Sequence, residues 1–237
     1  ETIEAWNEPE GKSSPARTTR SSRDQFRCLM AAENISEAQR DARPVIQRVL
    51  NRTARAQQFG LLPKAFDYSK TALNEFVTQQ HEKAIRPKQD QGPRHPLGLE
   101  DWRWILTQLT PAVLIDGAWL SGVPAVPSMM KPWHQQLVRI LDDELGQGKP
   151  AQNHPLIFRG LLESLGIFLP KVDDPEFTTD SRFRSQAFDF AAYMLAMGWM
   201  YGPFEAECLG LNLAIELSGL GRGYQDAITS MKACGID

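Results

Sequence analysis

The sequence predicts an all-α protein, and three observations support this prediction. From Ser36 onward, apolar residues recur at spacings of three and four, which is the period of an amphipathic helix. Prolines and glycines gather at the ends of these periodic stretches, where helices begin and end. We find no stretch that alternates apolar and polar residues between turn signals, as a strand would. Helices packed on helices are therefore the expected architecture.

Two regions precede the main body of the chain. Residues 1–24 are polar and have no apolar period, so we expect a flexible N-terminal arm. Residues 25–96 are expected to form N-terminal helices, the first over Ser36–Phe59 and the second over Lys64–Ile85. The polar, proline-containing stretch Arg86–Pro96 is predicted to be the linker that follows them.

Residues 97–237 are expected to form the helical core. Thr110-Pro111 predicts a helix start, because a hydroxyl N-cap followed by proline at the first helical position suits the free amides there. Gly146 and Gly148 predict the end of the helix before them. The helices that we expect in this region cover Asp101–Leu109, Pro111–Leu120, Lys131–Leu145, Pro155–Leu165, Arg182–Met200, Pro203–Leu217 and Gly223–Cys234.

Composition and charge argue against several classes of protein. Hydrophobic residues make up 42% and charged residues 23% of the 237 positions, as in ordinary globular proteins. A net charge of −3 and the lack of basic patches interleaved with aromatics argue against a nucleic-acid partner. Apolar stretches are too short to span a bilayer, so no membrane partner is expected. Three scattered cysteines predict no disulfide framework, and a reducing cytoplasmic location is the default expectation.

Common catalytic motifs are missing or out of context. Gly219–Gly223 is dense in glycine but follows a helix rather than a strand and lacks the lysine of a phosphate-binding loop. No Gly-x-Ser-x-Gly motif is present, so a hydrolase of that kind is not predicted.

Glu144 and His154 are the first candidate site residues. Each lies at one end of a predicted helix, and the glycine-containing turn between them would let the two helices run antiparallel. Both side chains would then lie at the same end of the pair, where a carboxylate and an imidazole suit Fe, Mn or Zn. Asn153-His154-Pro155 is equally compatible with a simple helix cap, and this alternative stays open.

Three more carboxylates occur in apolar surroundings. Glu216 lies in the run from Cys208 to Leu217, and it is either exposed on the outer face or held by a donor or metal inside. Glu207 precedes it by nine residues, so on a continuous helix the two lie about 180° apart. Asp116 lies within Ala112–Leu120, where a carboxylate must be paired, protonated or bound to a metal. A structural aspartate at a kink near Gly117 is the alternative reading.

Taken together, these segments resemble a known family. They are Asp116-Gly-Ala-Trp-Leu, Asp143-Glu-Leu-Gly-Gln-Gly leading to Asn153-His-Pro-Leu-Ile-Phe, and Glu207-Cys-Leu-Gly-Leu-Asn-Leu-Ala-Ile-Glu-Leu-Ser-Gly-Leu-Gly. Their order and spacing over residues 97–237 are similar to those of the iron-containing redox enzymes of the haem-oxygenase-like fold. The resemblance implies a haem-oxygenase-like helical bundle.

The same resemblance implies a non-haem iron site on three core helices, with two Fe(II) ions per complete chain. Glu144 and His154 match the ligands of the first helix. Glu216 is our choice for the second helix and Glu207 is the fallback, while Asp116 is an accessory ligand. The third helix should supply a His/Asp/His cluster. The sequence ends at Asp237, where that helix should begin, so we expect it to be absent here and the core to be C-terminally incomplete.

The resemblance also implies the chemistry. Such enzymes use Fe(II) and O₂ as co-substrate to oxidise a small organic molecule, and we favour N-oxygenation of an amine or amino acid in a biosynthetic pathway. Oxidative C–C cleavage of an amino or fatty acid by the same site is the first alternative. A metal-free helical binding or interaction protein is the second. A homodimer is compatible with either reading.

Overall fold

The computed structural model describes residues 20–62, 67–86, 96–124 and 129–236. Most of the predicted arm, the start of the predicted helix at Lys64, most of the linker and part of the loop before Lys131 lie outside these residues. Helices α1 to α10 cover Ser22–Met30, Ile35–Gln58, Lys70–Ile85, Leu99–Val113, His134–Glu144, His154–Ser164, Pro175–Thr179, Ala187–Trp199, Glu205–Gly219 and Arg222–Ala233. Short 3-10 helices η1 and η3 cover Ala118–Leu120 and Pro150–Gln152. The described residues contain no strand, which confirms the all-α prediction.

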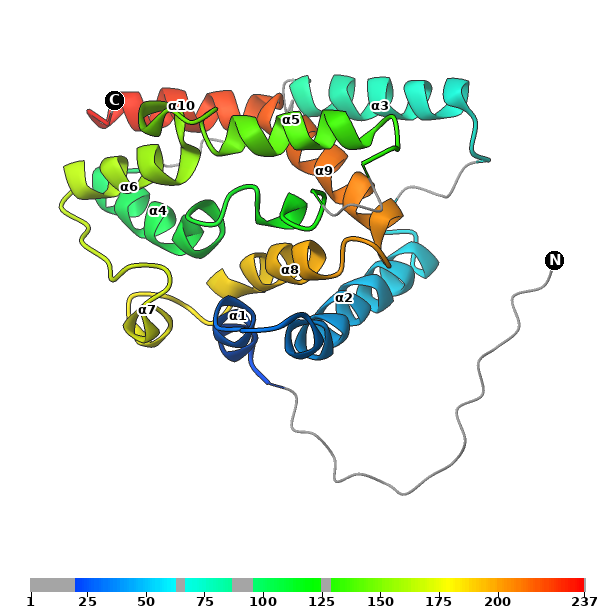
Figure 1. Cartoon of the computed structure of the whole chain (residues 1–237). Helices are drawn as coiled ribbons and strands as arrows, with labels where there is room; N and C mark the ends of the chain where they lie inside the picture. The colour runs from blue at the N-terminus through cyan, green and yellow to red at the C-terminus, as the bar shows by residue number, and fades with distance from the viewer. Residues whose placement is uncertain (1–19, 63–66, 87–95, 125–128, 237) are drawn as a thin grey trace.

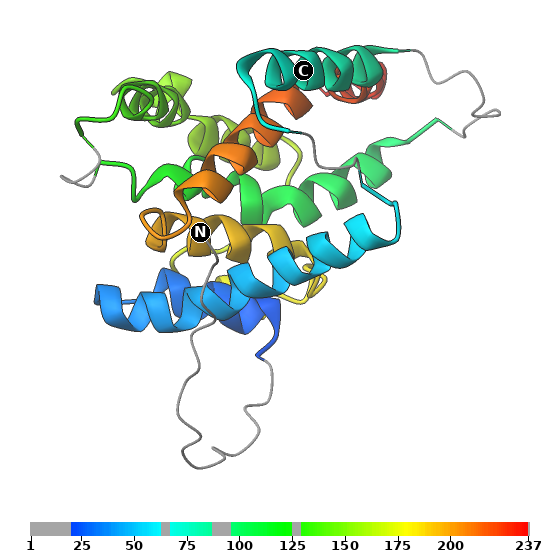
Figure 2. The ribbon, with the colours of Figure 1, turned by 90° about the vertical axis from the view of Figure 1, so that its right-hand side faces the viewer.

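Helix α8 is the centre of the fold. Seven of its thirteen residues are buried, and of the others only Asp189 and Phe190 are exposed. A helix that is apolar on most sides must be covered by neighbours, and here α1, α2, α4 and η1 pack against it. Figure 2 shows α8 with α2 below it and α9 rising from its end, while α3, α5 and α10 form the opposite layer in Figure 1.

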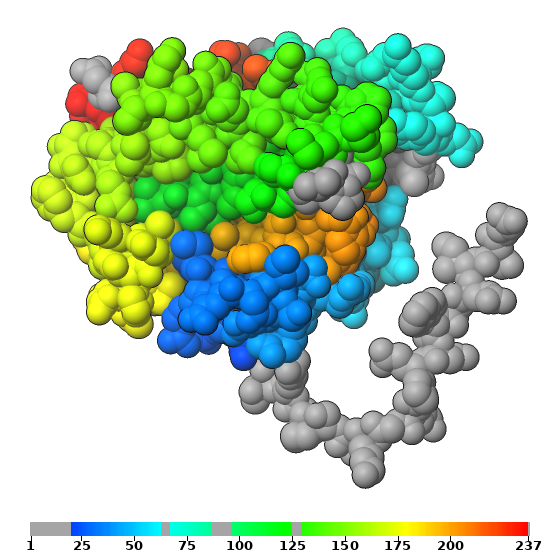
Figure 3. Space-filling model, in the orientation of Figure 1, coloured from blue at the N-terminus to red at the C-terminus, as the bar shows by residue number. Residues whose placement is uncertain are grey.

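Helices α1 and α2 belong to this same core. Phe26 of α1 lies 5.3 Å from Phe188 of α8 and 6.2 Å from Phe177 of α7, measured between ring centroids. Arg23 also links α1 to α7 and the loop after it, because its guanidinium donates to the carbonyl oxygens of Thr178 and Phe183. Helices α1 and α2, from the region 25–96, therefore share one core with the region 97–237, and Figure 3 shows them along the lower side of the molecule.

Two short helices were not predicted. α1 begins at Ser22, inside the range 1–24 that the sequence assigns to the arm, and the side chain of Ser21 caps it. α7 is five residues long. Neither is long enough to display a helical period, and both depend on aromatic contacts with α8 that come from distant parts of the chain.

The predicted helix start at Thr110-Pro111 is wrong. α4 runs without interruption from Leu99 to Val113 and contains Pro111 in its last turn. The Thr110 hydroxyl donates to the carbonyl oxygen of Leu106 instead of capping a new helix. Pro111 has no backbone N–H, so its position lacks one hydrogen bond of the helix. Beyond it the chain forms turns and then η1, rather than the predicted helix over Pro111–Leu120.

A pair of glycines brings η1 into contact with α8. A Cβ atom on Gly198 would overlap the carbonyl oxygen of Ala118, and one on Gly122 would overlap the carbonyl oxygen of Gly198. Only glycine permits backbones to approach this closely. The contact fixes the segment that contains Trp119, which is fully buried and donates to Asn212 of α9. Within the described residues no helix has the length and apolarity required to cross a bilayer.

Gly198→Ala should destabilise the protein by about 3 kcal/mol, because the added methyl group cannot be accommodated without separating η1 from α8. Gly210→Ala is the matched control, since a Cβ there meets nothing within 4 Å and the helix interior should gain roughly 0.5–1 kcal/mol. Urea denaturation followed by circular dichroism measures both. Equal stabilities of the two variants would contradict the packing argument.

Candidate metal centre

A tight turn connects Glu144, the last residue of α5, with His154, the first residue of α6. Gly146 and Gly148 take positive φ angles of 80° and 74° in this turn. At Gly146 a Cβ would lie only 2.5 Å from the backbone nitrogen of Asn153, so glycine is required there. The sequence prediction that Gly146 ends the helix is thus confirmed, and the turn holds the ends of α5 and α6 together.

Asn153 fixes the position of His154. Its side-chain oxygen accepts from the backbone N–H of Leu156 and caps α6, while its amide nitrogen donates to the carbonyl oxygen of Leu145. One side chain therefore ties the first turn of α6 to the last turn of α5. The cap that the sequence offers as an alternative to a metal site is real, and Asn153 provides it. His154 is left free to face Glu144.

Asp116 lies in the turn after α4, and its carboxyl group lies beside Glu144 and His154. The next residue, Gly117, has φ of 82°, and a Cβ there would lie 3.2 Å from the Cβ of Glu144. This close approach packs the turn against the end of α5. Three segments that are separate in the sequence thus bring their polar side chains to one point.

The three side chains form a compact group. One ligand atom from each of Asp116, Glu144 and His154 lies within 4.8 Å of the other two. His154 Nδ1 lies 3.5 Å from Asp116 Oδ2 and in direct contact with Glu144 Oε2. Glu144 is buried, Asp116 is half-buried, and about half of the His154 side chain is exposed. The group is therefore anchored inside the protein and open on the histidine side.

Burial controls the protonation of the two carboxyl groups. Desolvation, together with the neighbouring carboxylate of Asp116, raises the pKa of Glu144 to about 7, even though contact with His154 acts in the opposite direction. Desolvation also raises the pKa of Asp116. Two acids at one buried point repel each other when ionised, so without a cation this group favours at least one proton.

The donor set suits iron. Bonds of about 2.1 Å to a central ion place ligand atoms no more than about 4.2 Å apart, so this group needs little adjustment. Two carboxylates and an imidazole are ligands that Fe(II) accepts. Moreover, the buried Oε2 of Glu144 accepts no hydrogen bond from any described residue, despite its contact with His154. A buried acceptor of this kind is expensive unless a cation or proton satisfies it.

The structure does not bring every predicted ligand to this point. Among the described residues, Asp116, Glu144 and His154 form the group that could hold a metal ion. Glu207, half-buried on α9, acts on Tyr193 of α8, whose pKa is raised mainly by burial and further by this carboxylate. Glu216 is exposed near the end of α9. Both stay predictions as metal ligands.

Residues that the sequence reading did not emphasise also shape the site. Asn153 and Gly117 position two of the ligands, and only the cap signal Asn-x-Pro and the glycine after Asp116 hinted at them. Trp119 belongs to the hydrophobic core, and Trp199 packs against that core. Trp119 is fully buried, and Trp199 donates to the carbonyl oxygen of Leu29.

Comparison with known proteins identifies the family of the chain. A family model described as "iron-containing redox enzyme" matches residues 103–237, which is more than half of the chain and includes all three candidate ligands. Searches of curated proteins and of solved structures find no significant match.

The metal-free protein should lose stability as the pH rises. The folded state holds a proton on Glu144 up to about pH 7, whereas an unfolded chain releases it near the ordinary value of 4.5. The stabilisation is therefore complete below the unfolded value and is lost as the pH passes the folded one. With a chelator present, the melting temperature of Glu144→Gln should fall less than that of the wild type between about pH 5 and 8.

Asp142→Asn is the control for this measurement, because it removes one carboxylate from the exposed side of the same helix. It should keep the pH dependence of the wild type. If the melting temperatures of the wild type and Glu144→Gln change equally between these pH values, Glu144 is not protonated in the folded protein.

Proposed function

The chain belongs to the iron-containing redox enzyme family and is an iron-dependent oxidoreductase, and we propose that Asp116, Glu144 and His154 hold Fe(II) in a non-haem centre. In this proposal the centre uses O₂ to oxidise a small organic substrate. The supporting observation is the convergence of three ligand atoms from three segments on one point, with a buried oxygen of Glu144 that accepts no hydrogen bond from the described residues.

Each ligand has a distinct part in this proposal. Glu144 supplies the buried negative charge that draws a cation inside, and binding would displace the proton that burial favours. Asp116 adds a second charge, so the pair would neutralise a divalent ion. His154 completes the set through Nδ1, the ring nitrogen that faces both carboxylates. Asn153 and Gly117 keep the ligands in place before the ion arrives.

The open side of the group is where reactants would enter. About half of the His154 side chain is exposed, so coordination positions on that side are accessible to small molecules. Iron bound there would supply the one-electron and O₂ chemistry that amino-acid side chains lack. We favour N-oxygenation of an amine or amino acid, by likeness to the family. Glu216, with Glu207 as the fallback, is proposed as a ligand on the second core helix.

An anaerobic Fe(II) titration tests the centre. Glu144→Gln, His154→Ala and Asp116→Asn should each weaken Fe(II) binding by about tenfold or more, because each removes a ligand from the group. His81→Ala removes a histidine from α3, outside the group, and should bind as the wild type does. Glu216→Ala shows whether a ligand from α9 takes part.

The outcomes separate the alternatives. Affinity unchanged in all three ligand variants would place the iron elsewhere in the protein. Weaker binding in Glu216→Ala as well would extend the site to α9, while no effect there would leave Glu207 as the candidate ligand from that helix. Absence of Fe(II) binding by the wild type would contradict the proposed centre and favour a metal-free helical protein.

A further inference from the structure

The second half of α2 carries an unbalanced positive charge. From residue 42 to its end at Gln58, the helix contains four arginines and no acidic residue, although the whole chain has a net charge of −3. Nearer the start of the helix, by contrast, Arg40 lies 3.8 Å from Asp41. Neither Arg52 nor Arg55 makes an ion pair or a side-chain hydrogen bond with any described residue. The positive charge is therefore concentrated toward the end of α2.

Three of these arginines form a stripe along one side of the helix. Arg48, Arg52 and Arg55 are separated by four and then three residues, so they lie within about 60° of one another around the helix axis. Arg48 is half-buried and donates to the side chain of Gln25 in α1, whereas Arg52 and Arg55 are exposed. We call this group the arginine stripe. Like charges at these spacings repel each other, so the stripe is unfavourable in the isolated protein.

The stability of the helix accounts for only part of the stripe. Arg55 lies in the last turn, where the partial negative charge of the helix end attracts a cation. This attraction falls off within the last turn, so it contributes little at Arg52. Arg52 also has like charges on both sides along the stripe. Local structure therefore gives no account of Arg52, and its charge is available to an anionic partner.

Large apolar side chains follow the stripe directly. Phe59, at the C-cap of α2, is 78% exposed, and Leu61 is 76% exposed. Phe59 lies on the side of the stripe, because it follows Arg55 by four residues. In Figure 2 the end of α2 lies at the edge of the molecule. We call Phe59 and Leu61 the apolar tip. Exposed apolar side chains that gather at one place mark an interaction site.

We propose that the arginine stripe and the apolar tip dock this protein on the surface of an anionic lipid bilayer. The guanidinium groups pair with negative lipid headgroups, and Phe59 and Leu61 enter the boundary between headgroups and acyl chains. An anionic bilayer matches both features, because its negative charges lie directly above an apolar layer. A nucleic acid offers phosphates for the arginines but no apolar layer for Leu61.

Docking of this kind needs no spanning helix. The expectation that the chain has no membrane partner rests on the lack of a spanning segment, and no helix of the described residues can cross a bilayer. Arginines beside exposed phenylalanine and leucine side chains bind in the headgroup region instead. The proposal is independent of the iron centre, since its candidate ligands lie after α4 and at the ends of α5 and α6.

Sedimentation of the full chain with lipid vesicles tests the proposal. Vesicles of phosphatidylcholine mixed with phosphatidylserine should bind the protein at least about tenfold more tightly than vesicles of phosphatidylcholine alone. The double variant Arg52→Gln/Arg55→Gln should bind the mixed vesicles about thirtyfold more weakly, because each cation near an anionic surface contributes about fivefold. Phe59→Ser should weaken binding by about tenfold, because an inserted phenylalanine leaves water.

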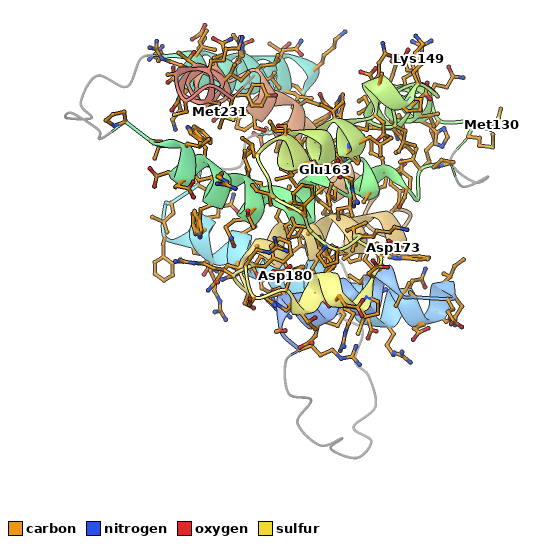
Figure 4. The ribbon with its side chains drawn as sticks, turned by 90° about the vertical axis from the view of Figure 1, so that its left-hand side faces the viewer. Met130, Lys149, Glu163, Asp173, Asp180 and Met231 are labelled. Atoms are coloured by element: carbon orange, nitrogen blue, oxygen red, sulfur yellow. The ribbon has the colours of Figure 1, made fainter. Side chains whose placement is uncertain are left out.

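Matched controls remove the same groups from other parts of the molecule. Arg139→Gln/Lys232→Gln makes the same change in net charge but takes exposed cations from α5 and α10. Figure 4 shows Met231, the neighbour of Lys232, in the layer opposite to α1 and α2. Phe168→Ser removes a phenylalanine that is 69% exposed and lies outside α2. Both controls should bind the mixed vesicles as the wild type does.

Three results would overturn the proposal. The first is the absence of vesicle binding by wild-type protein whose circular dichroism shows native helix content. The second is equal binding to the two kinds of vesicle. The third is equal binding by the arginine double variant and its matched control. If the wild type binds double-stranded DNA but no vesicles, the stripe belongs to a nucleic-acid site and the membrane proposal is wrong.

Discussion

The close approach of η1 to α8 is the contact on which the rest of the structure depends. Gly198 and Gly122 let the two backbones meet, and this contact holds the segment between α4 and α5 against the buried central helix. Trp119 is locked there by burial and by its hydrogen bond to Asn212, and Asp116 lies three residues before it. The position of one candidate ligand therefore follows from the packing of the core and not from the flexible side chain alone.

The candidate centre shows a conflict between stability and function. Burial of Glu144 beside Asp116 is unfavourable in the absence of a cation, since desolvation and repulsion both raise the pKa of Glu144. A protein selected for stability alone would replace such a pair with apolar side chains. The turn glycines and Asn153 instead hold the acids together. Strain kept in this way is typical of a site that is built for an ion.

Much of the fold follows from the sequence, because the amphipathic periods of α2 and α6 and the glycine after α5 are local signals. Elements that depend on distant contacts do not: α1 is helical because Phe26 meets Phe188. The wrong prediction of a helix start at Thr110-Pro111 has a similar origin. The residue types alone do not reveal that the Thr110 hydroxyl donates to a carbonyl oxygen inside α4. The turn between Glu144 and His154 predicts that these two side chains meet, whereas no local signal places Asp116 beside Glu144.

The location of the three ligands explains why they can act together. None lies in a helix interior: Glu144 ends α5, His154 begins α6, and Asp116 follows α4. Side chains at helix ends can converge from directions that a single helix face does not allow, and the turns that hold them are set by glycine conformations rather than by long side chains. Because these turns are fixed by backbone geometry, the candidate ligands would be in position before an ion binds. The entropy cost of assembling the site is then met during folding, so that more of the metal–ligand energy remains for affinity.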